Sequence, residues 1–161
     1  MLGNSKFAGS SLDSRAILGL LPHRYPMLLV DHVTECVPGV RIRGYKNISQ
    51  PEPCFAAEKT RSKAMPTYLV IEAMAQMAVI LTFRSLGLEP CGKELIFFAG
   101  IDDARFSGFS FPGDRLQLDC SIVRLMPTRG IGKFSTVASV GTRELVKATL
   151  IAALQLPDRL V

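Results

Sequence analysis

The chain has 161 residues, of which 48% are hydrophobic and 20% are charged. This length suits one domain with a sizeable core, and the composition is typical of a folded protein rather than a disordered one. The formal net charge of +5 is a mild bias, with basic residues gathered at Lys59, Arg61 and Lys63. No aromatic residues are interleaved with them, so we expect no nucleic-acid partner. An acidic protein partner is preferred, and a merely solvated basic face is an equal alternative.

Residues 1–13 lack the apolar core of a secretory signal, and we expect them to form a flexible lead into a single domain over residues 14–161. The most hydrophobic stretch is interrupted by Glu72 and Gln76 and is shorter than the ~20 apolar residues that span a bilayer. We therefore expect a cytoplasmic protein without a membrane partner. Four scattered cysteines without a C-x-x-C pair indicate reduced thiols rather than disulfides or a metal site: Cys36, Cys54, Cys91 and Cys120.

The first half of the chain predicts a short helix, a hairpin and a long loop. Residues 14–21 form a short helical pattern that ends at Pro22. Residues 27–37 and 40–48 are rich in β-branched residues and flank Pro38-Gly39, which predicts two strands joined by a turn. Residues 49–65 show no periodicity, and a loop of this length in a compact domain is usually functional.

Residues 66–83 predict one helix that is apolar on every face and therefore belongs inside the fold. Proline suits the first turn, and the next glycine or proline is Gly87. Glu72 and Gln76 lie four residues apart, so they share one face and are expected to point the same way out of the core.

The second half of the chain predicts about four strands. Residues 94–106 have strand composition, and alternating Leu116, Leu118, Cys120 and Ile122 indicate a strand buried on one face. Residues 133–140 and 144–155 follow after short turns and complete an antiparallel meander. The whole pattern predicts an α+β hotdog fold, in which an antiparallel sheet of about six strands wraps around one central helix. Pairing of sheet edges in a dimer would cover the exposed edge strand.

Six blocks occur in the order seen in one hotdog family: L-P-H-R-Y-P-M-L-L-V-D (21–31), Y-K-N-I-S (45–49), E-P-C-F (52–55), L-V-I-E-A-M-A-Q (69–76), F-A-G-I-D-D-A-R-F (98–106) and P-G-D-R-L (112–116). On these blocks the chain resembles 3-hydroxyacyl-(acyl-carrier-protein) dehydratases of the FabZ and FabA type. The resemblance implies removal of water from a 3-hydroxyacyl thioester held on acyl carrier protein, in fatty-acid or in polyketide or polyene-type biosynthesis. The sequence contains no phosphate-cradling loop, nucleophile elbow or metal-ligand spacing, so we expect no bound cofactor and no metal.

In the family, a loop histidine handles the proton beside the carbonyl, and a helix glutamate of the neighbouring subunit handles the hydroxyl. A backbone N–H at the helix start polarises the thioester carbonyl. The resemblance assigns the glutamate to Glu72. The family's loop pattern, G-H-F-P-x-x-P-x-x-P-G, falls on residues 57–67, where Glu58 occupies the histidine position and Thr67 the final glycine.

The resemblance also implies which residues bind substrate. Thr67 still offers its N–H, but its side chain and that of Tyr68 are expected to narrow the substrate tunnel. Other substrate-binding candidates lie on the helix, on the following strand and beside the tunnel mouth: Gln76, Phe98, Lys59, Arg61 and Lys63.

The loss of the loop histidine is the most informative departure from the family. The chain contains only His23 and His32, and neither lies in the catalytic loop. We expect both to be structural, so that the chain cannot supply the usual catalytic pair by itself. In a homodimer Glu58 of one subunit would approach Glu72 of the other. Repulsion between the two carboxylates would disfavour the state in which both are ionised.

Three hypotheses follow. The favoured one is a pseudoenzyme subunit that lacks its own base and contributes Glu72 to a heterodimer with a histidine-bearing relative. The second is a self-sufficient hotdog dehydratase or thioesterase that uses Glu58. The third is a non-catalytic protein that binds acyl carrier protein or an acyl chain, for which the basic cluster beside the expected tunnel mouth is suited.

Overall fold

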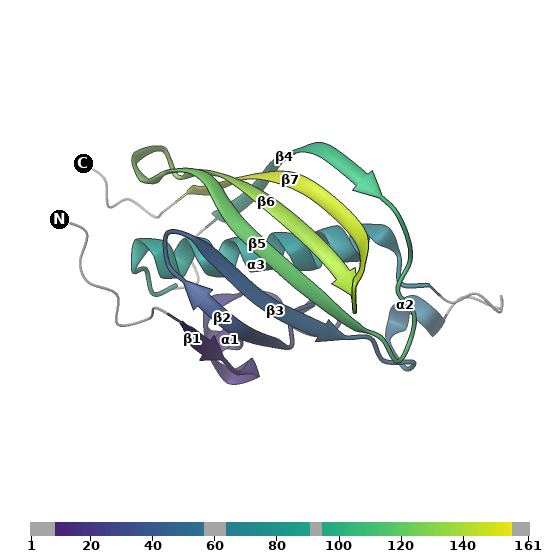
Figure 1. Cartoon of the computed structure of the whole chain (residues 1–161). Coiled ribbons are helices and arrows are strands. Elements are labelled where there is room, and N and C mark those ends of the chain that lie inside the picture. Colours follow the sequence, from purple (N-terminus) through teal and green to yellow (C-terminus); the bar gives the residue numbers. More distant parts are fainter. Residues whose placement is uncertain (1–8, 57–63, 91–94, 156–161) are drawn as a thin grey trace.

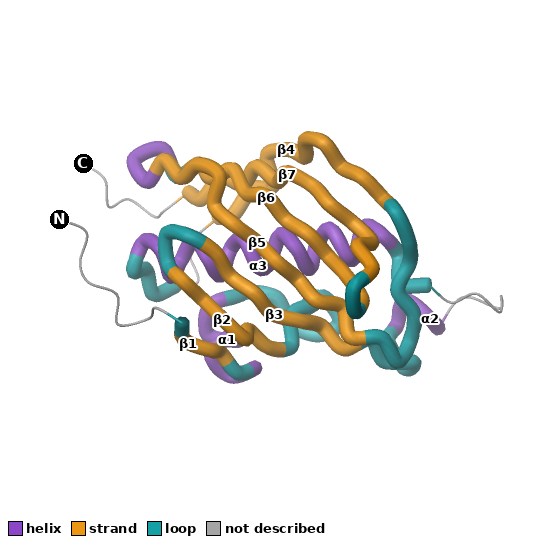
Figure 2. Tube along the Cα trace, viewed as in Figure 1, coloured by secondary structure: helices purple, strands orange, loops and turns teal. Residues whose placement is uncertain are grey.

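A computed structural model of the chain describes residues 9–56, 64–90 and 95–155. These residues form one antiparallel sheet of seven strands in the order β1-β2-β3-β5-β6-β7-β4. The strands are β1 (Ser10–Leu12), β2 (His32–Val37), β3 (Arg41–Asn47), β4 (Leu95–Phe106), β5 (Arg115–Met126), β6 (Ile131–Val140) and β7 (Arg143–Gln155). The helices are α1 (Ser14–Leu20), α2 (Pro53–Ala56) and α3 (Thr67–Leu86), with one 3₁₀ turn, η1 (Pro127–Arg129). Figures 1 and 2 show the sheet curving across α3, and the architecture is the predicted α+β hotdog fold.

The sheet follows the predicted pattern of one buried and one exposed face. On β5, Leu116, Leu118 and Cys120 are buried while Gln117 and Ser121 are exposed. The predicted hairpin is confirmed as β2 and β3, although β2 begins at His32 and not at residue 27, and the predicted meander is confirmed as β5, β6 and β7. The concave face of the sheet is therefore mostly apolar, and α3 packs against it.

The central helix starts one residue after the predicted start and runs to Leu86, three residues beyond the predicted end at residue 83. Pro66 occupies the N-cap position, and Gly87 ends the helix with φ of 63°, a left-handed conformation that glycine adopts without strain. Ala73, Met77 and Ile80 are completely buried. The helix has the length and mean hydropathy (1.5) of a membrane span, but it packs as the core helix against the sheet.

Two short elements were not expected. Residues 10–12 were expected to belong to a flexible lead, but they form β1, in which Ser10 pairs with Cys36 of β2. The sheet therefore has seven strands instead of about six. Residues 53–56 form α2 within the region expected to be a loop. Elements of three or four residues are too short to show a hydrophobic period, so sequence patterns do not reveal them.

Candidate active site

Helix α3 presents Glu72 and Gln76 on one face, as their spacing predicts. The expectation that both point out of the core is wrong for Gln76, which is only 1% exposed. The reason is that the segment between α1 and β2 crosses this face of the helix. About one third of the Glu72 side chain remains exposed.

Gln76 fixes that segment to the helix through two hydrogen bonds and makes a third to Glu72 of the same helix. Its Oε1 accepts the Leu29 N–H at 2.9 Å, and its Nε2 donates to the Met27 carbonyl at 2.7 Å. The same Nε2 donates to Glu72 Oε1 at 2.8 Å. Because the Leu29 N–H must meet an oxygen, the amide can be oriented in only one way, with its NH₂ group toward Glu72.

The same segment brings His23 to the carboxylate. His23 Nε2 lies 3.4 Å from Glu72 Oε1, and about 31% of the imidazole side chain is exposed. Arg24 holds the backbone here by donating to the carbonyls of Leu18 and Leu21. The structure therefore brings His23, which we expected to be structural, beside Glu72. No spacing rule predicts this contact, because His23 and Glu72 are far apart in the sequence and meet only when the segment folds over α3.

A cavity of about 310 Å³ opens beside this pair, between α3 and the strands β4 and β7. Its polar wall consists of Glu72, Gln76 and His23. The other wall is apolar and contains Pro22, Ala75, Ala78, Val79, Ile96, Phe97, Phe98, Leu150 and Ala152. The arrangement is suited to an elongated apolar ligand that carries a polar group at one end.

A second, much smaller void continues the apolar side of this cavity. It shares Val79, Ile96 and Ala152 with the main cavity and extends to Phe83 and Leu154. All of its lining side chains are apolar apart from Thr82. This void has a volume of only about 10 Å³, so it extends the apolar lining along α3 without offering room for a ligand chain.

The predicted substrate-binding residues are distributed unevenly around this cavity. Phe98 and Gln76 line it, whereas Thr67 and Tyr68, at the start of α3, do not. Tyr68 is exposed. The remaining candidates, Glu58, Lys59, Arg61 and Lys63, lie outside the described residues.

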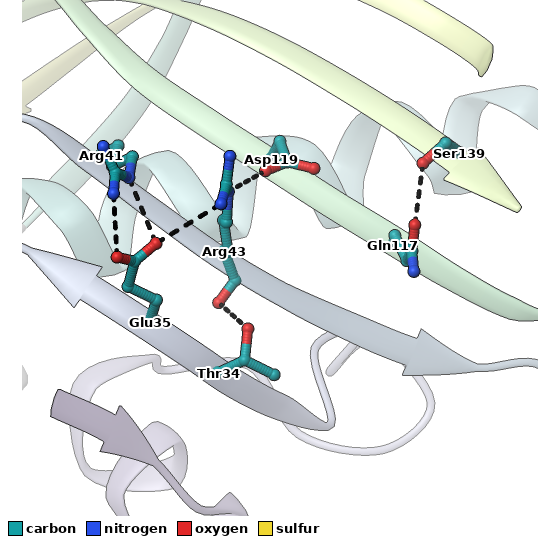
Figure 3. Close-up of polar contacts among 7 residues, drawn as sticks. All are labelled: Thr34, Glu35, Arg41, Arg43, Gln117, Asp119 and Ser139. Atoms are coloured by element: carbon teal, nitrogen blue, oxygen red, sulfur yellow. Dashed lines mark hydrogen bonds and ion pairs between the residues drawn. The ribbon is translucent and has the colours of Figure 1, made fainter. Parts of the chain in front are cut away.

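The outer face of the sheet carries a separate polar cluster, shown in Figure 3. Arg41 donates to both oxygens of Glu35, at 3.2 and 2.9 Å, and Arg43 joins Glu35 to Asp119. Hydrogen bonding from Arg41 holds the pKa of Glu35 below its usual value. The charges of this cluster satisfy one another across three strands, so the cluster is structural rather than a second reactive site.

The described residues around the cavity offer proton-transfer groups rather than metal ligands. Within the part of the chain that the structure describes, no three His, Cys, Asp or Glu side chains come close enough to hold a metal ion. The burial of Cys36 raises the pKa of its thiol, so this cysteine is a poor nucleophile at neutral pH. The chemistry available in the described cavity is proton transfer between Glu72, His23 and a bound ligand.

Fold and site together define a class: a hotdog protein that sets a carboxylate of its central helix at the end of an apolar cavity. Comparison with known proteins places the chain within this class. The model of the FabA-like domain matches residues 21–149. The chain therefore belongs to the FabA-like domain family.

Comparisons with individual proteins support this family assignment. The chain is 43% identical over 144 residues to a protein of Polaromonas naphthalenivorans named 3-hydroxyacyl-[acyl-carrier-protein] dehydratase FabZ, covering 89% of this chain and 98% of that protein. It is 44% identical over 143 residues to the protein of the same name from Chromobacterium violaceum, covering 89% and 93%. Among solved structures, the dehydratase heterocomplex ApeI:P from Xenorhabdus doucetiae matches with a TM-score of 0.73 and 17% identity, over 87% of this chain and 91% of that one. That last likeness concerns the fold alone.

Proposed function

We propose that the chain is a dehydratase of 3-hydroxyacyl thioesters carried by acyl carrier protein, and that Glu72 is its reacting carboxylate. The family and its FabZ relatives support the reaction class. Water leaves the substrate as one proton is removed from C2 and another is added to the C3 hydroxyl, so the site needs at least one group that gives or takes protons.

One observation carries the proposal: a partly exposed carboxylate lies at the polar end of a cavity that is otherwise apolar. Glu72 Oε1 is held by Gln76, while no described residue hydrogen-bonds to Oε2. The apolar wall suits the acyl chain of such a substrate, and Oε2 is available to the substrate hydroxyl. A carboxylate that only stabilised the fold would not need an apolar cavity beside it.

The test is the rate of enoyl thioester formation from 3-hydroxybutyryl and 3-hydroxydecanoyl acyl carrier protein. Glu72→Gln keeps the shape of the side chain but cannot transfer a proton, so kcat is expected to fall by about 10²–10⁴-fold. Glu35→Gln, on the outer face of the sheet, is the matched control and should retain the full rate. Full activity of Glu72→Gln, both alone and in any complex isolated from the native cells, would rule the proposal out.

A second candidate is a subunit of a mixed dimer that contributes Glu72 to a site completed by a histidine-bearing relative. The observation that favours it is the loop sequence, in which Glu58 stands at the position that the family pattern gives to histidine. The purified chain alone would then be inactive, and co-expression with such a relative would restore turnover. The Glu72→Gln variant of this chain would abolish the turnover of the pair.

A further inference from the structure

The two histidines of the chain have different surroundings. His32 stacks on Tyr45 with 5.5 Å between ring centroids and does not line the cavity. His23 lines the cavity and faces Glu72. Only one imidazole of this chain is therefore placed to meet a ligand in that cavity.

His23 exposes a single nitrogen to the site. Its Nδ1 is buried and has no hydrogen-bond partner among the described residues. Its Nε2 is directed to Glu72 Oε1 at 3.4 Å, a distance longer than an ordinary hydrogen bond. Nε2 is therefore the nitrogen that can exchange a proton with the cavity, and it is not committed to a short bond in the absence of a ligand.

Glu72 has a complementary division between its two oxygens. Oε1 accepts from the amide of Gln76 and faces His23. Oε2 has no partner among the described residues. A protonated Glu72 can therefore keep Oε1 as the accepting oxygen and present its proton on Oε2.

We propose that His23 is the second proton-transfer group of this site, which would make its imidazole a catalytic residue supplied by the same chain as Glu72. The inference rests on the proposed dehydratase function and replaces the loop histidine that the family pattern would require. It removes the need for an imidazole from a relative.

The reaction balances if Glu72 holds one proton at the start and His23 Nε2 holds none. His23 Nε2 takes a proton from C2, the electron pair of that C–H bond forms the C2=C3 double bond, and the C3–O bond breaks. The leaving hydroxyl takes the proton of Glu72 and departs as water. His23 then carries an extra proton and Glu72 is a carboxylate. Transfer of that proton from Nε2 to Oε1, followed by its exchange to Oε2 through solvent, restores the starting state.

The distance between the two groups also limits the geometry. The C2–H and C3–OH bonds lie on neighbouring carbons. His23 Nε2 lies 3.4 Å from Oε1 of the Glu72 carboxyl group, so the imidazole and the carboxyl group can reach these bonds only from the same face of the substrate. The elimination should therefore remove the C2 hydrogen that is syn to the C3 hydroxyl. A substrate with deuterium at a single, defined C2 position reports this by mass spectrometry of the enoyl product.

The experiment compares His23→Gln with His32→Gln in the full chain. Glutamine retains a polar side chain and an N–H donor but is not a base, so His23→Gln should fold normally. We expect kcat to fall by about 10²–10⁴-fold with little change in KM, and we expect His32→Gln to keep the activity of the parent chain. A readout independent of activity is the NMR spectrum of the two imidazoles: Glu72→Gln should shift the signals of His23 and leave those of His32 in place.

The possible outcomes separate the two proposals. If Glu72→Gln loses activity while His23→Gln keeps the parent kcat, the role of His23 is overturned and the proposed function stands. If neither variant loses activity, both proposals fail. A parent chain that gains activity only with a histidine-bearing relative, and keeps it in the His23→Gln variant, overturns the role of His23 in favour of the mixed dimer. No turnover in any of these forms also rejects both proposals.

Discussion

Gln76 has almost no contact with solvent, and each of its hydrogen bonds holds a part of the candidate site in place. It joins the backbone at Met27 and Leu29 to the carboxylate of Glu72. The segment that carries His23 is thereby fixed to α3 by one side chain. Gln76 is a positioning residue in this arrangement, because it acts on a ligand only through Glu72 and His23.

We predict that Gln76→Leu destabilises the protein and impairs the site together. Leucine fills a similar volume but leaves the Leu29 N–H and the Met27 carbonyl without partners, which costs about 1–3 kcal/mol. The loss of the bond to Glu72 should also lower kcat by roughly tenfold or more, since small displacements of reacting groups are costly. Urea unfolding and the dehydratase assay measure the two effects.

Gln117→Leu is the control for this prediction. Gln117 is exposed on β5, where its Oε1 accepts from the Ser139 hydroxyl at 3.3 Å (Figure 3). We expect the free energy of unfolding to change by no more than about 0.5 kcal/mol. Equal losses for Gln76→Leu and Gln117→Leu would show that the buried hydrogen bonds of Gln76 do not support the segment.

At the residue scale, sequence reasoning found the helix side of the site and missed the segment that faces it. Glu72 and Gln76 could be found because two polar residues interrupt an apolar helix at a spacing that puts them on one face. His23 could not be found in this way, because its position depends on how an aperiodic segment crosses α3. Thr67 and Tyr68 were expected from a family pattern and lie outside the cavity of the single chain.

At the scale of elements, hydrophobic periodicity was sufficient for the sheet and the helix. The alternation on β5 predicts one buried face of the sheet, and the apolar surface of α3 predicts a helix buried on nearly all sides. A sheet wrapped around the helix buries both. The sequence pattern does not state how closely the layers approach. One glycine of β3 shows a close approach that this pattern does not reveal.

Gly44 lies where β3 meets both its neighbour β2 and the central helix. A Cβ atom at this position would collide with the carbonyl oxygen of His32 and lie 3.0 Å from Cε of Met77. The flexible methionine could move, but the backbone oxygen belongs to the paired strand. The close pairing of β3 with β2 therefore requires glycine here.

We predict that Gly44→Ala destabilises the protein by about 1–3 kcal/mol through overpacking. Gly19→Ala is the control, and it is expected to stabilise the protein. Gly19 lies in α1, where an added methyl group would have no atom within 4 Å. Alanine is favoured over glycine in a helix by about 0.5–1 kcal/mol. Urea denaturation midpoints compare the two. A Gly44→Ala protein as stable as the parent would show that β2 and β3 can separate without loss.

At the scale of the whole molecule, the sheet ends in two unequal edges. The β1 edge is three residues long, and a short edge offers little template for pairing. The β4 edge is twelve residues long and pairs only with β7 among the described strands. It also exposes large apolar side chains: Phe97, Phe98, Ile101 and Phe106.

The β4 edge also borders the cavity, since Phe97 and Phe98 line it. A second hotdog subunit placed along β4 would cover the apolar side chains and add a wall near Glu72. This arrangement is common to the homodimer and to the mixed dimer considered above. The β4 edge therefore does not distinguish a second copy of this chain from a related subunit. The two dimers differ in the proton-transfer groups that the second subunit would bring to the site.

We predict that Ile101→Lys weakens self-association of the chain, raising the dimer Kd by roughly tenfold or more, because burying a lysine among apolar side chains costs at least about 1–2 kcal/mol. Val123→Lys is the control: Val123 is 58% exposed, compared with 42% for Ile101, but it lies on β5 inside the sheet. Sedimentation equilibrium measures both. Unchanged association of Ile101→Lys, or equal weakening by Val123→Lys, would place the interface elsewhere and leave the β4 edge for another partner.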